Sequence, residues 1–324
     1  MKGRRILLIL SIAALLVGCG GVQTPSRPVI QGADQASGAL TTKNMDAVHG
    51  QKTTCGGPAE KIFNIDVIEH NVDLGMGTSF AAWTYNGRIP APTLEACEGD
   101  KVTINVTNKG TTAHGLDTHA MKIDARHYGP VLPGKTMTMV KTVDTPGVFM
   151  YHCASGPVTD FHIKSGIHGA MIVYPRNEQF RPAREIVVVE DAIYGTRDAE
   201  GFIPGTDPAK AQKNDQTYSM FNGRLDNAAV RVNPGDLVRM YFVNVGPGIS
   251  SAHVIGTVLD RVYDGKIPVY GVQTYAVPAG SGAILEFYIP EEGVFPFVDH
   301  DKLAYLPSGL ALAFATGDIP ATAH

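Results

Sequence analysis

The sequence predicts an all-β protein built from two tandem domains of one fold. Short runs rich in β-branched residues recur between clusters of Gly, Pro, Asn and Asp, as in β-sandwiches and barrels. Parts of the sequence repeat after 136 residues, and no long stretch keeps the apolar period of a helix. With 324 residues, 44% hydrophobic and 18% charged, the chain has enough apolar side chains for two globular cores.

The N-terminus reads as a secretion signal. In residues 1–18, basic residues precede an apolar run over 6–17 that is short for a membrane span. The following stretch, Leu-Val-Gly-Cys, resembles the bacterial lipobox, in which the cysteine is lipidated and becomes the first mature residue. We expect a lipid anchor on Cys19 at the periplasmic side of the envelope, with the outer membrane favoured because Gly20 follows. An ordinary cleaved signal is the alternative.

The charge of the chain argues against nucleic acid as a partner. The formal net charge is -4, and it becomes -7 once Lys2, Arg4 and Arg5 leave with the signal. A phosphate-binding surface would need a basic excess. No second apolar run is long enough to cross a membrane, so the anchor is the expected membrane contact.

Composition and repeats set the domain boundaries. Residues 19–57 are rich in Gly, Ser, Thr, Gln and Ala, which is typical of a flexible tether. The next residues, 58–176, form the first expected domain, and residues 183–318 form the second. The strand-like runs are 101–108, 136–143 and 169–175 in the first domain and 184–191, 237–244 and 283–290 in the second.

Two motifs carry the repeat. The turn sequence YNGR at 85–88 returns as FNGR at 221–224, and EGDKV at 98–102 returns as PGDLV at 234–238. The matched order of these motifs indicates two copies of one β-domain.

The cysteines divide by context. Cys19 belongs to the anchor and Cys153 to a histidine-rich motif, which leaves Cys55 and Cys97. A disulfide between those two suits an oxidising compartment. The sequence leaves open whether they meet.

Histidines around Cys153 form a candidate metal site. Successive side chains of a strand point to opposite faces. His114 and His119 are five apart, and His152 and Cys153 are adjacent, so each pair diverges if extended. His114, Cys153 and His162 can therefore converge inside the domain, as the His₂Cys set of a blue-copper electron-transfer centre. One peptide unit joins Cys153 to His152, which gives an electron a short route.

His119 and His152 can converge on the outer face. Two imidazoles need a third ligand, and the second domain offers His253 and His300. Asp117 lies two residues before His119, so its carboxylate is expected on the same face. A carboxylate there, opposite an unligated histidine, could deliver protons to a metal-bound substrate.

With these residues the sequence resembles the two-domain copper nitrite reductases of the multicopper oxidase and cupredoxin superfamily. The segment 114–119 (HGLDTH) matches the family pattern H-x-x-D-x-H. The segment 152–162 matches H-C-x8-H, and 253–256 (HVIG) matches H-x-I-G. His300 follows a Gly-Val-Phe run, as the last type 2 ligand does in the family.

The resemblance implies two cupredoxin-like Greek-key domains, a homotrimer and two coppers per subunit, type 1 and type 2. Nitrite would be reduced to nitric oxide with an electron from a small periplasmic cupredoxin or c-type cytochrome. Lipoprotein members are also known in this family. The implied roles are type 1 ligands His114, Cys153 and His162, type 2 ligands His119, His152 and a neighbour's His300, and catalytic residues Asp117, His253 and Ile255.

Ile167 departs from the family pattern. It stands at the position of the axial methionine of type 1 copper and cannot coordinate. Because the weak axial ligand tunes the potential, we expect copper to bind with a raised type 1 potential. In the alternatives, His168 binds through a shifted loop, or the site holds no copper. Met171 lies in an expected buried strand and is interpreted as a core residue.

Two rival functions are a laccase-like multicopper oxidase and a non-catalytic copper or electron-transfer lipoprotein. A laccase needs paired His-x-His motifs, and none occurs in the chain; Ala154 follows Cys153. A carrier has no use for the proton-delivering pocket of Asp117, His253 and Ile255.

Overall fold

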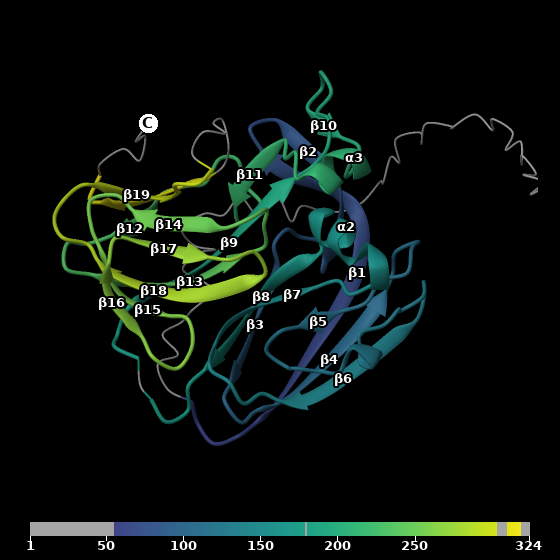
Figure 1. Cartoon of the computed structure of the whole chain (residues 1–324), viewed down its shortest axis with the longest axis horizontal. Coiled ribbons are helices and arrows are strands. Elements are labelled where there is room, and N and C mark those ends of the chain that lie inside the picture. The colour runs from purple at the N-terminus through teal and green to yellow at the C-terminus, as the bar shows by residue number, and fades with distance from the viewer. Residues whose placement is uncertain (1–54, 179, 303–309, 319–324) are drawn as a thin grey trace, which may run out of the picture. The chain divides into compact units, whose positions relative to one another are not determined.

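The computed structural model describes residues 55–178, 180–302 and 310–318. The expected signal, Cys19 and most of the tether lie outside this part of the chain. The described residues form strands joined by loops and a few short helical turns, so the all-β prediction is confirmed (Figure 1). None of the described helices is long and apolar enough to span a membrane.

The first half of the body contains two sheets. Their strand orders are β10-β2-β1-β4-β6 and β3-β8-β7-β5. The short strand β10 comes from the second half and pairs in parallel with β2. The bounds are β1 Glu60–Gly75, β2 Thr78–Tyr85, β3 Ala91–Cys97, β4 Lys101–Asn108, β5 Asp117–Thr118, β6 Thr136–Thr142, β7 Gly147–His152, β8 His168–Tyr174 and β10 Phe202–Ile203.

The second half also contains two sheets, with strand orders β11-β9-β13-β18-β15-β16 and β12-β20-β19-β14-β17. The bounds are β9 Arg184–Ile193, β11 Tyr218–Phe221, β12 Val230–Val232, β13 Leu237–Asn244, β14 Ser250–Val254, β15 Leu259–Tyr263, β16 Val269–Val272, β17 Thr274–Val277, β18 Ser281–Tyr288, β19 Val294–Asp299 and β20 Ala311–Thr316. The division of the body into two domains near residue 180 stays a prediction.

Four short helical turns interrupt the strands in the described part of the chain. They are η1 Ala125–His127, η2 Gly156–Val158, α2 Thr159–Lys164 and α3 Pro208–Lys213. The turn α2 follows η2 directly and buries His162. It thereby brings a histidine next to the end of β7.

The repeated Asn-Gly turns adopt the same conformation in both halves. Asn86 and Gly87 have φ angles of 53° and 75°, and Asn222 and Gly223 have 54° and 67°. Positive φ at both central positions is a feature of type I′ hairpin turns, for which Asn-Gly is the preferred pair. Each asparagine side chain also accepts a hydrogen bond from a neighbouring strand amide, at 2.7 and 2.8 Å.

The loops after β4 and β13 are held by equivalent asparagine hydrogen bonds. The Asn108 side-chain amide donates to the carbonyls of Thr112 (2.7 Å) and Val131 (2.8 Å). The Asn244 amide donates to the carbonyls of Gly248 (2.9 Å) and Val277 (2.8 Å). The first loop leads to the segment 114–119, and the second leads to β14 with the segment 253–256.

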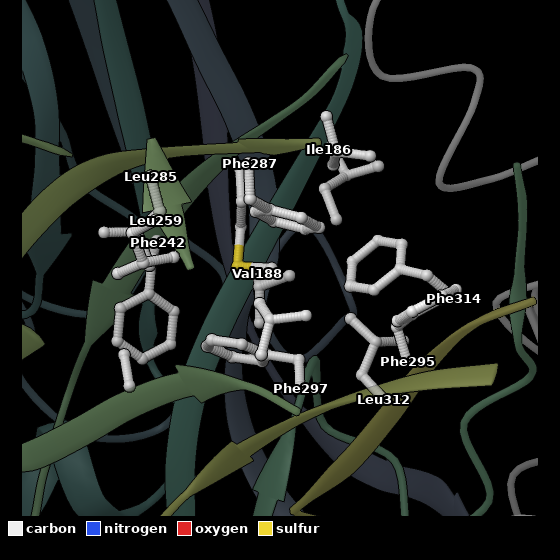
Figure 2. Packing of buried hydrophobic residues seen from close by; sticks show 14 of the residues in the cluster. Ile186, Val188, Phe242, Leu259, Leu285, Phe287, Phe295, Phe297, Leu312 and Phe314 are labelled. Atoms are coloured by element: carbon white, nitrogen blue, oxygen red, sulfur yellow. The ribbon is translucent and has the colours of Figure 1, made fainter. Parts of the chain in front are cut away.

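A large aromatic and aliphatic cluster fills the second half. Figure 2 shows Phe242, Phe287, Phe297 and Phe314 packed with aliphatic side chains of the facing sheets. Alternating residues of β13 enter this cluster, and the residues between them face the first half. Burial of each such side chain stabilises the folded state by about 1.5–3 kcal/mol.

The sheet with β7 and β8 is buried on both faces. Tyr151, Cys153 and Met171 face the core of the first half. On the other side, Val148 and Ile172 pack against residues of β9, β13 and β18. Adjacent residues at the end of β7 therefore face opposite sides of the sheet.

Cys55 and Cys97 form a disulfide, with their Cα atoms 5.9 Å apart. It joins the start of the described body to the end of β3. The Asp100 carboxylate also accepts hydrogen bonds from the amides of Cys97 and Ala59, both at 2.9 Å. The pairing that the sequence left open is thus present in the structure.

Candidate metal centres

His114, Cys153 and His162 converge in the core of the first half. The Cys153 Sγ lies 3.6 Å from Nδ1 of His114 and 3.3 Å from Nδ1 of His162. The two Nδ1 atoms are 3.2 Å apart, and all three residues are buried. A point amid these atoms lies about 2 Å from each, which is the length of a metal–nitrogen bond. Two imidazoles and a thiolate are the donors that copper prefers, so the residues fit this metal.

Neighbouring polar groups orient the ligands. The Nε2 atom of His114 lies 2.9 Å from Oγ1 of Thr112 and 3.5 Å from a carboxylate oxygen of Glu69. A proton on Nε2 can thus be donated to Glu69 and Thr112, which leaves the Nδ1 lone pair for a metal. The Gly115 amide donates to the Cys153 sulfur at 3.4 Å.

Burial keeps the site in its uncharged form when no metal is bound. It lowers the pKa of His114, and burial with the nearby His114 charge lowers the pKa of His162 to about 4. Burial also raises the pKa of the Cys153 thiol to about 12, although the Gly115 amide opposes this shift. A metal that binds the thiolate must therefore displace a proton.

Trp83 packs on both histidines of this site. Its ring is edge-on to His162 at a centroid distance of 4.5 Å and to His114 at 5.1 Å. Phe161 adds a further edge contact to Trp83 at 5.7 Å. Trp83 and Glu69 could not be predicted as neighbours of this site from the sequence, because they lie on β2 and β1, far from the histidine motifs along the chain.

Ile167 and His168 point to different surroundings. Ile167 is fully buried in the cluster that contains Cys153, and its carbonyl accepts the Cys153 amide at 3.2 Å. The ring nitrogens of His168 instead lie 3.1 Å from the Asp191 carboxylate and 3.2 Å from the Ile163 carbonyl. The structure does not bring His168 into the Cys153 group.

Met171 has a role in packing. It is fully buried in β8, and its sulfur accepts a hydrogen bond from the Thr118 hydroxyl at 3.5 Å. These contacts match its interpretation as a core residue.

Asp117, His119 and His152 form a second group. The Nε2 atoms of His119 and His152 are 3.2 Å apart, and an Asp117 oxygen lies 4.0 Å from Nε2 of His152. The Nδ1–H of His152 donates to the Cys153 carbonyl at 2.8 Å, which leaves its Nε2 lone pair toward His119. Catalytic metal sites typically use three protein ligands and keep one position free for substrate. The two imidazole nitrogens of this group would supply two of those ligands, so one more protein ligand is needed.

This second group borders a cavity of about 430 Å³ between the two halves. His119 and His152 line it together with His168 and Asp191. His119 is exposed, whereas His152 is nearly buried. Burial lowers the pKa of His152, and the neighbouring His119 acts in the same direction.

His253 and His300 form a separate pair on β14 and directly after β19. Their ring centroids are 5.1 Å apart, and His300 is exposed. The Nδ1–H of His253 donates to the Gln273 carbonyl at 2.6 Å. Ile255 beside them is 45% exposed. Within the described chain, neither histidine joins the group of Asp117, His119 and His152.

The segment 114–119 is less regular than the extended strand that the sequence predicts. Only Asp117–Thr118 of the segment 114–119 forms a strand, paired with β7. His114 nevertheless turns inward, and Asp117 and His119 turn toward His152.

Known proteins resemble this chain in sequence. A family model for multicopper oxidases matches residues 66–178. A copper-containing nitrite reductase of Neisseria gonorrhoeae is 34% identical over 257 residues, which are 75% of this chain and 65% of the relative. The chain thus spans less than two thirds of the length of this curated relative.

Two solved structures resemble this chain over a larger share of its length. A copper nitrite reductase from Nitrosomonas europaea matches with a TM-score of 0.73 and 30% identity, over 80% of this chain and 95% of that chain. A Cu-containing nitrite reductase from Thermus scotoductus matches with a TM-score of 0.72 and 29% identity, over 80% of this chain and 62% of that chain.

Proposed function

The chain belongs to the family of copper-containing nitrite reductases, and on this basis we propose that it reduces nitrite to nitric oxide. The observation that carries the proposal is the direct link between two ligand groups. Cys153 belongs to the His₂Cys group, and the adjacent His152 belongs to the group with Asp117 and His119. An electron carrier needs only the first group, so the second indicates a reaction site.

Each group has a distinct task in this proposal. His114, Cys153 and His162 would hold type 1 copper, and His119 and His152 would hold type 2 copper. When bound, copper supplies a one-electron redox couple and a Lewis acid. The peptide unit between Cys153 and His152 would be the route of the electron. The Ile167 side chain has no donor atom, so His114, Cys153 and His162 would hold the copper without a fourth side-chain ligand, and we expect a higher type 1 potential than with a methionine at this position.

The third type 2 ligand comes from a neighbouring subunit in the proposed homotrimer. Among the described residues, no third imidazole joins His119 and His152, and His300, exposed beside His253, joins no metal-ligand group of its own chain. Three exposed apolar side chains flank β14, which carries His253: Ile249 before the strand, and Ile255 and Val258 after it. Such side chains are suited to a contact between subunits. Each chain thus carries both parts of the site, the pair His119 and His152 on one surface and His300 on another. In a cyclic assembly, the His300 of one subunit can meet the histidine pair of the next.

Asp117 and His253 are the proposed proton donors. The reaction consumes one electron and two protons for each nitrite and yields nitric oxide and water. Asp117 lies 4.0 Å from His152 and is therefore within reach of a substrate at that histidine. The hydrogen bond to Gln273 fixes the His253 ring, and the trimer would bring it opposite Asp117. Ile255 beside His253 would shape the substrate pocket.

The proposed setting is the periplasmic side of the cell envelope. The Cys55–Cys97 disulfide agrees with an oxidising compartment. Cys19 would carry the lipid anchor, with the outer membrane favoured, and residues 19–57 would tether the trimer. A small cupredoxin or c-type cytochrome would supply the electron near the type 1 site.

The test is anaerobic incubation of copper-loaded protein with nitrite and a reduced mediator while nitric oxide is monitored. We expect nitric oxide from the wild type, and a much lower rate from Asp117→Asn with both coppers retained. Absorption and electron paramagnetic resonance spectra count the copper of each type in the same samples. An intense thiolate band without nitric oxide would favour the carrier function. Oxygen consumption with a reducing substrate in a separate aerobic assay, together with no nitric oxide in the anaerobic one, would favour a laccase-like oxidase.

A further inference from the structure

We propose that Lys302 is a positioning residue for His300, which it holds by tying the turn at 299–302 to Glu190 of β9. This inference rests on the proposed function, in which His300 completes the type 2 site of a neighbouring subunit. Lys302 does not touch that site. It acts through the backbone that carries His300.

The Lys302 ammonium group lies in a buried ionic cluster. Its Nζ atom contacts the carboxylate of Glu190 and lies 3.0 Å from Oδ2 of Asp299. The Lys302 side chain is 4% exposed, and both carboxylates are fully buried. Ser250 donates its hydroxyl to the second Glu190 oxygen at 2.6 Å. The cluster therefore joins β9, β14 and the end of β19.

The same cluster fixes the residues on both sides of His300. One Asp299 oxygen accepts the amides of Ser251 at 2.7 Å and Asp301 at 3.0 Å. The His300 amide donates to the Ser251 carbonyl at 3.1 Å, and the Lys302 amide donates to the Asp299 carbonyl at 3.3 Å. The His300 backbone is thus held by groups inside the domain while its ring is exposed.

Position matters more for His300 than for an ordinary surface histidine. Its ring lies 5.1 Å from that of His253, and it must meet two imidazoles of another chain at bond distance. Groups that orient a ligand without touching the metal typically change metal affinity by about 10–100-fold when removed. Buried ion pairs give little net stability, and in some proteins they serve to fix one arrangement of the chain, which is the role proposed for Lys302.

Lys302 is suited to this task by its two contacts. A hydrophobic side chain would fill the same space without desolvating an ammonium group. Such a side chain would remove the direct ion pair between the turn and Glu190, which belongs to a different sheet from Asp299, and would leave the Ser250 hydroxyl of β14 as a less direct contact with Glu190. The lysine connects the two sheets of the second half at the point where His300 leaves β19.

The test compares variants of the full-length, copper-loaded protein. Lys302→Met alone leaves two buried carboxylates without a cation and can prevent folding. The double variant Glu190→Gln/Lys302→Met avoids one of these charges and keeps the volume of both side chains. A matched control is Glu286→Gln/Arg239→Met, which opens a buried cluster of the same half, in which Arg239 bridges Glu286 and Glu185.

Type 2 copper affinity is measured by competition with a chelator and followed by the type 2 signal in electron paramagnetic resonance. The blue type 1 band of the same sample reports the folded first half. For Glu190→Gln/Lys302→Met we expect an intact type 1 band, an altered type 2 spectrum and a type 2 Kd raised by about 10–100-fold. The matched control should keep the wild-type type 2 affinity and spectrum.

Wild-type type 2 affinity in the Lys302 double variant would overturn the assignment, and so would an equal loss in the control. These outcomes are separate from failure of the proposed function. If the wild type binds type 2 copper but forms no nitric oxide, the function fails while the role of Lys302 is still decided by the copper data. A wild-type protein without type 2 copper would overturn both.

Discussion

Copper binding at the inner site should release one proton at neutral pH, and this proton should come from Cys153. Burial raises the pKa of this thiol to about 12, so the metal-free site holds a neutral SH group. Burial lowers the pKa of His114, and the pKa of His162 falls to about 4, so both imidazoles are already deprotonated at pH 7 and above. The thiol proton is the one that the metal must displace.

The size of the effect follows from the pKa of the thiol. Between pH 7 and pH 9 the metal-free thiol stays protonated, so each pH unit should raise the apparent copper affinity about tenfold. Over two units this amounts to about 100-fold, or about 2.7 kcal/mol of binding free energy. An unperturbed thiol of pKa near 8.5 would reach a plateau within this range.

The assay is a titration with Cu(I) against a chromophoric chelator at several pH values, with the chelator corrected for its own protonation. The Cys153→Ala variant gives the background from other sites. A slope of one in log affinity against pH, continuing to pH 9, is the expected result. A flat dependence would mean that the thiolate exists before copper arrives, and the stated environment of Cys153 would then be wrong.

Three further predictions concern the inner site. Trp83 is the only tryptophan in the chain and lies 4.5 Å from the His162 ring, so copper loading should quench tryptophan fluorescence in the wild type but not in Cys153→Ala. A Cβ on Gly115 would lie 2.2 Å from the Ala154 carbonyl oxygen, so Gly115→Ala should lower the free energy of unfolding by about 1–3 kcal/mol and weaken the blue band, as denaturant unfolding and absorption would show. Ile167→Met places a thioether beside Cys153 and should lower the type 1 potential in a redox titration; an unchanged potential would show that the side chain does not reach the metal.

Alternation along strands explains why much of the site could be predicted from the sequence. His152 ends β7 and Cys153 follows it, so the two face opposite sides of a sheet that is buried on both faces. The strand-like run 101–108 coincides with β4, and 237–244 coincides with β13. The local sequence pattern is sufficient to predict which way a side chain points where residues adjacent along one strand determine that direction.

Long-range contacts could not be predicted in this way. Glu69 and Trp83 reach the inner site from β1 and β2, and no local pattern marks them. Lys302 and Glu190 are 112 residues apart and were not expected to meet. The position of His168 also required the structure, because Asp191 on β9 holds its ring on the side away from Cys153.

The most direct test of the account is single-turnover chemistry of the full-length, copper-loaded and fully reduced protein with ¹⁵N-labelled nitrite under anaerobic conditions. We expect labelled nitric oxide, oxidation of the type 1 site during the reaction, and a marked slowing in Asp117→Asn with both coppers bound. A protein with both coppers that yields no labelled nitric oxide would contradict it.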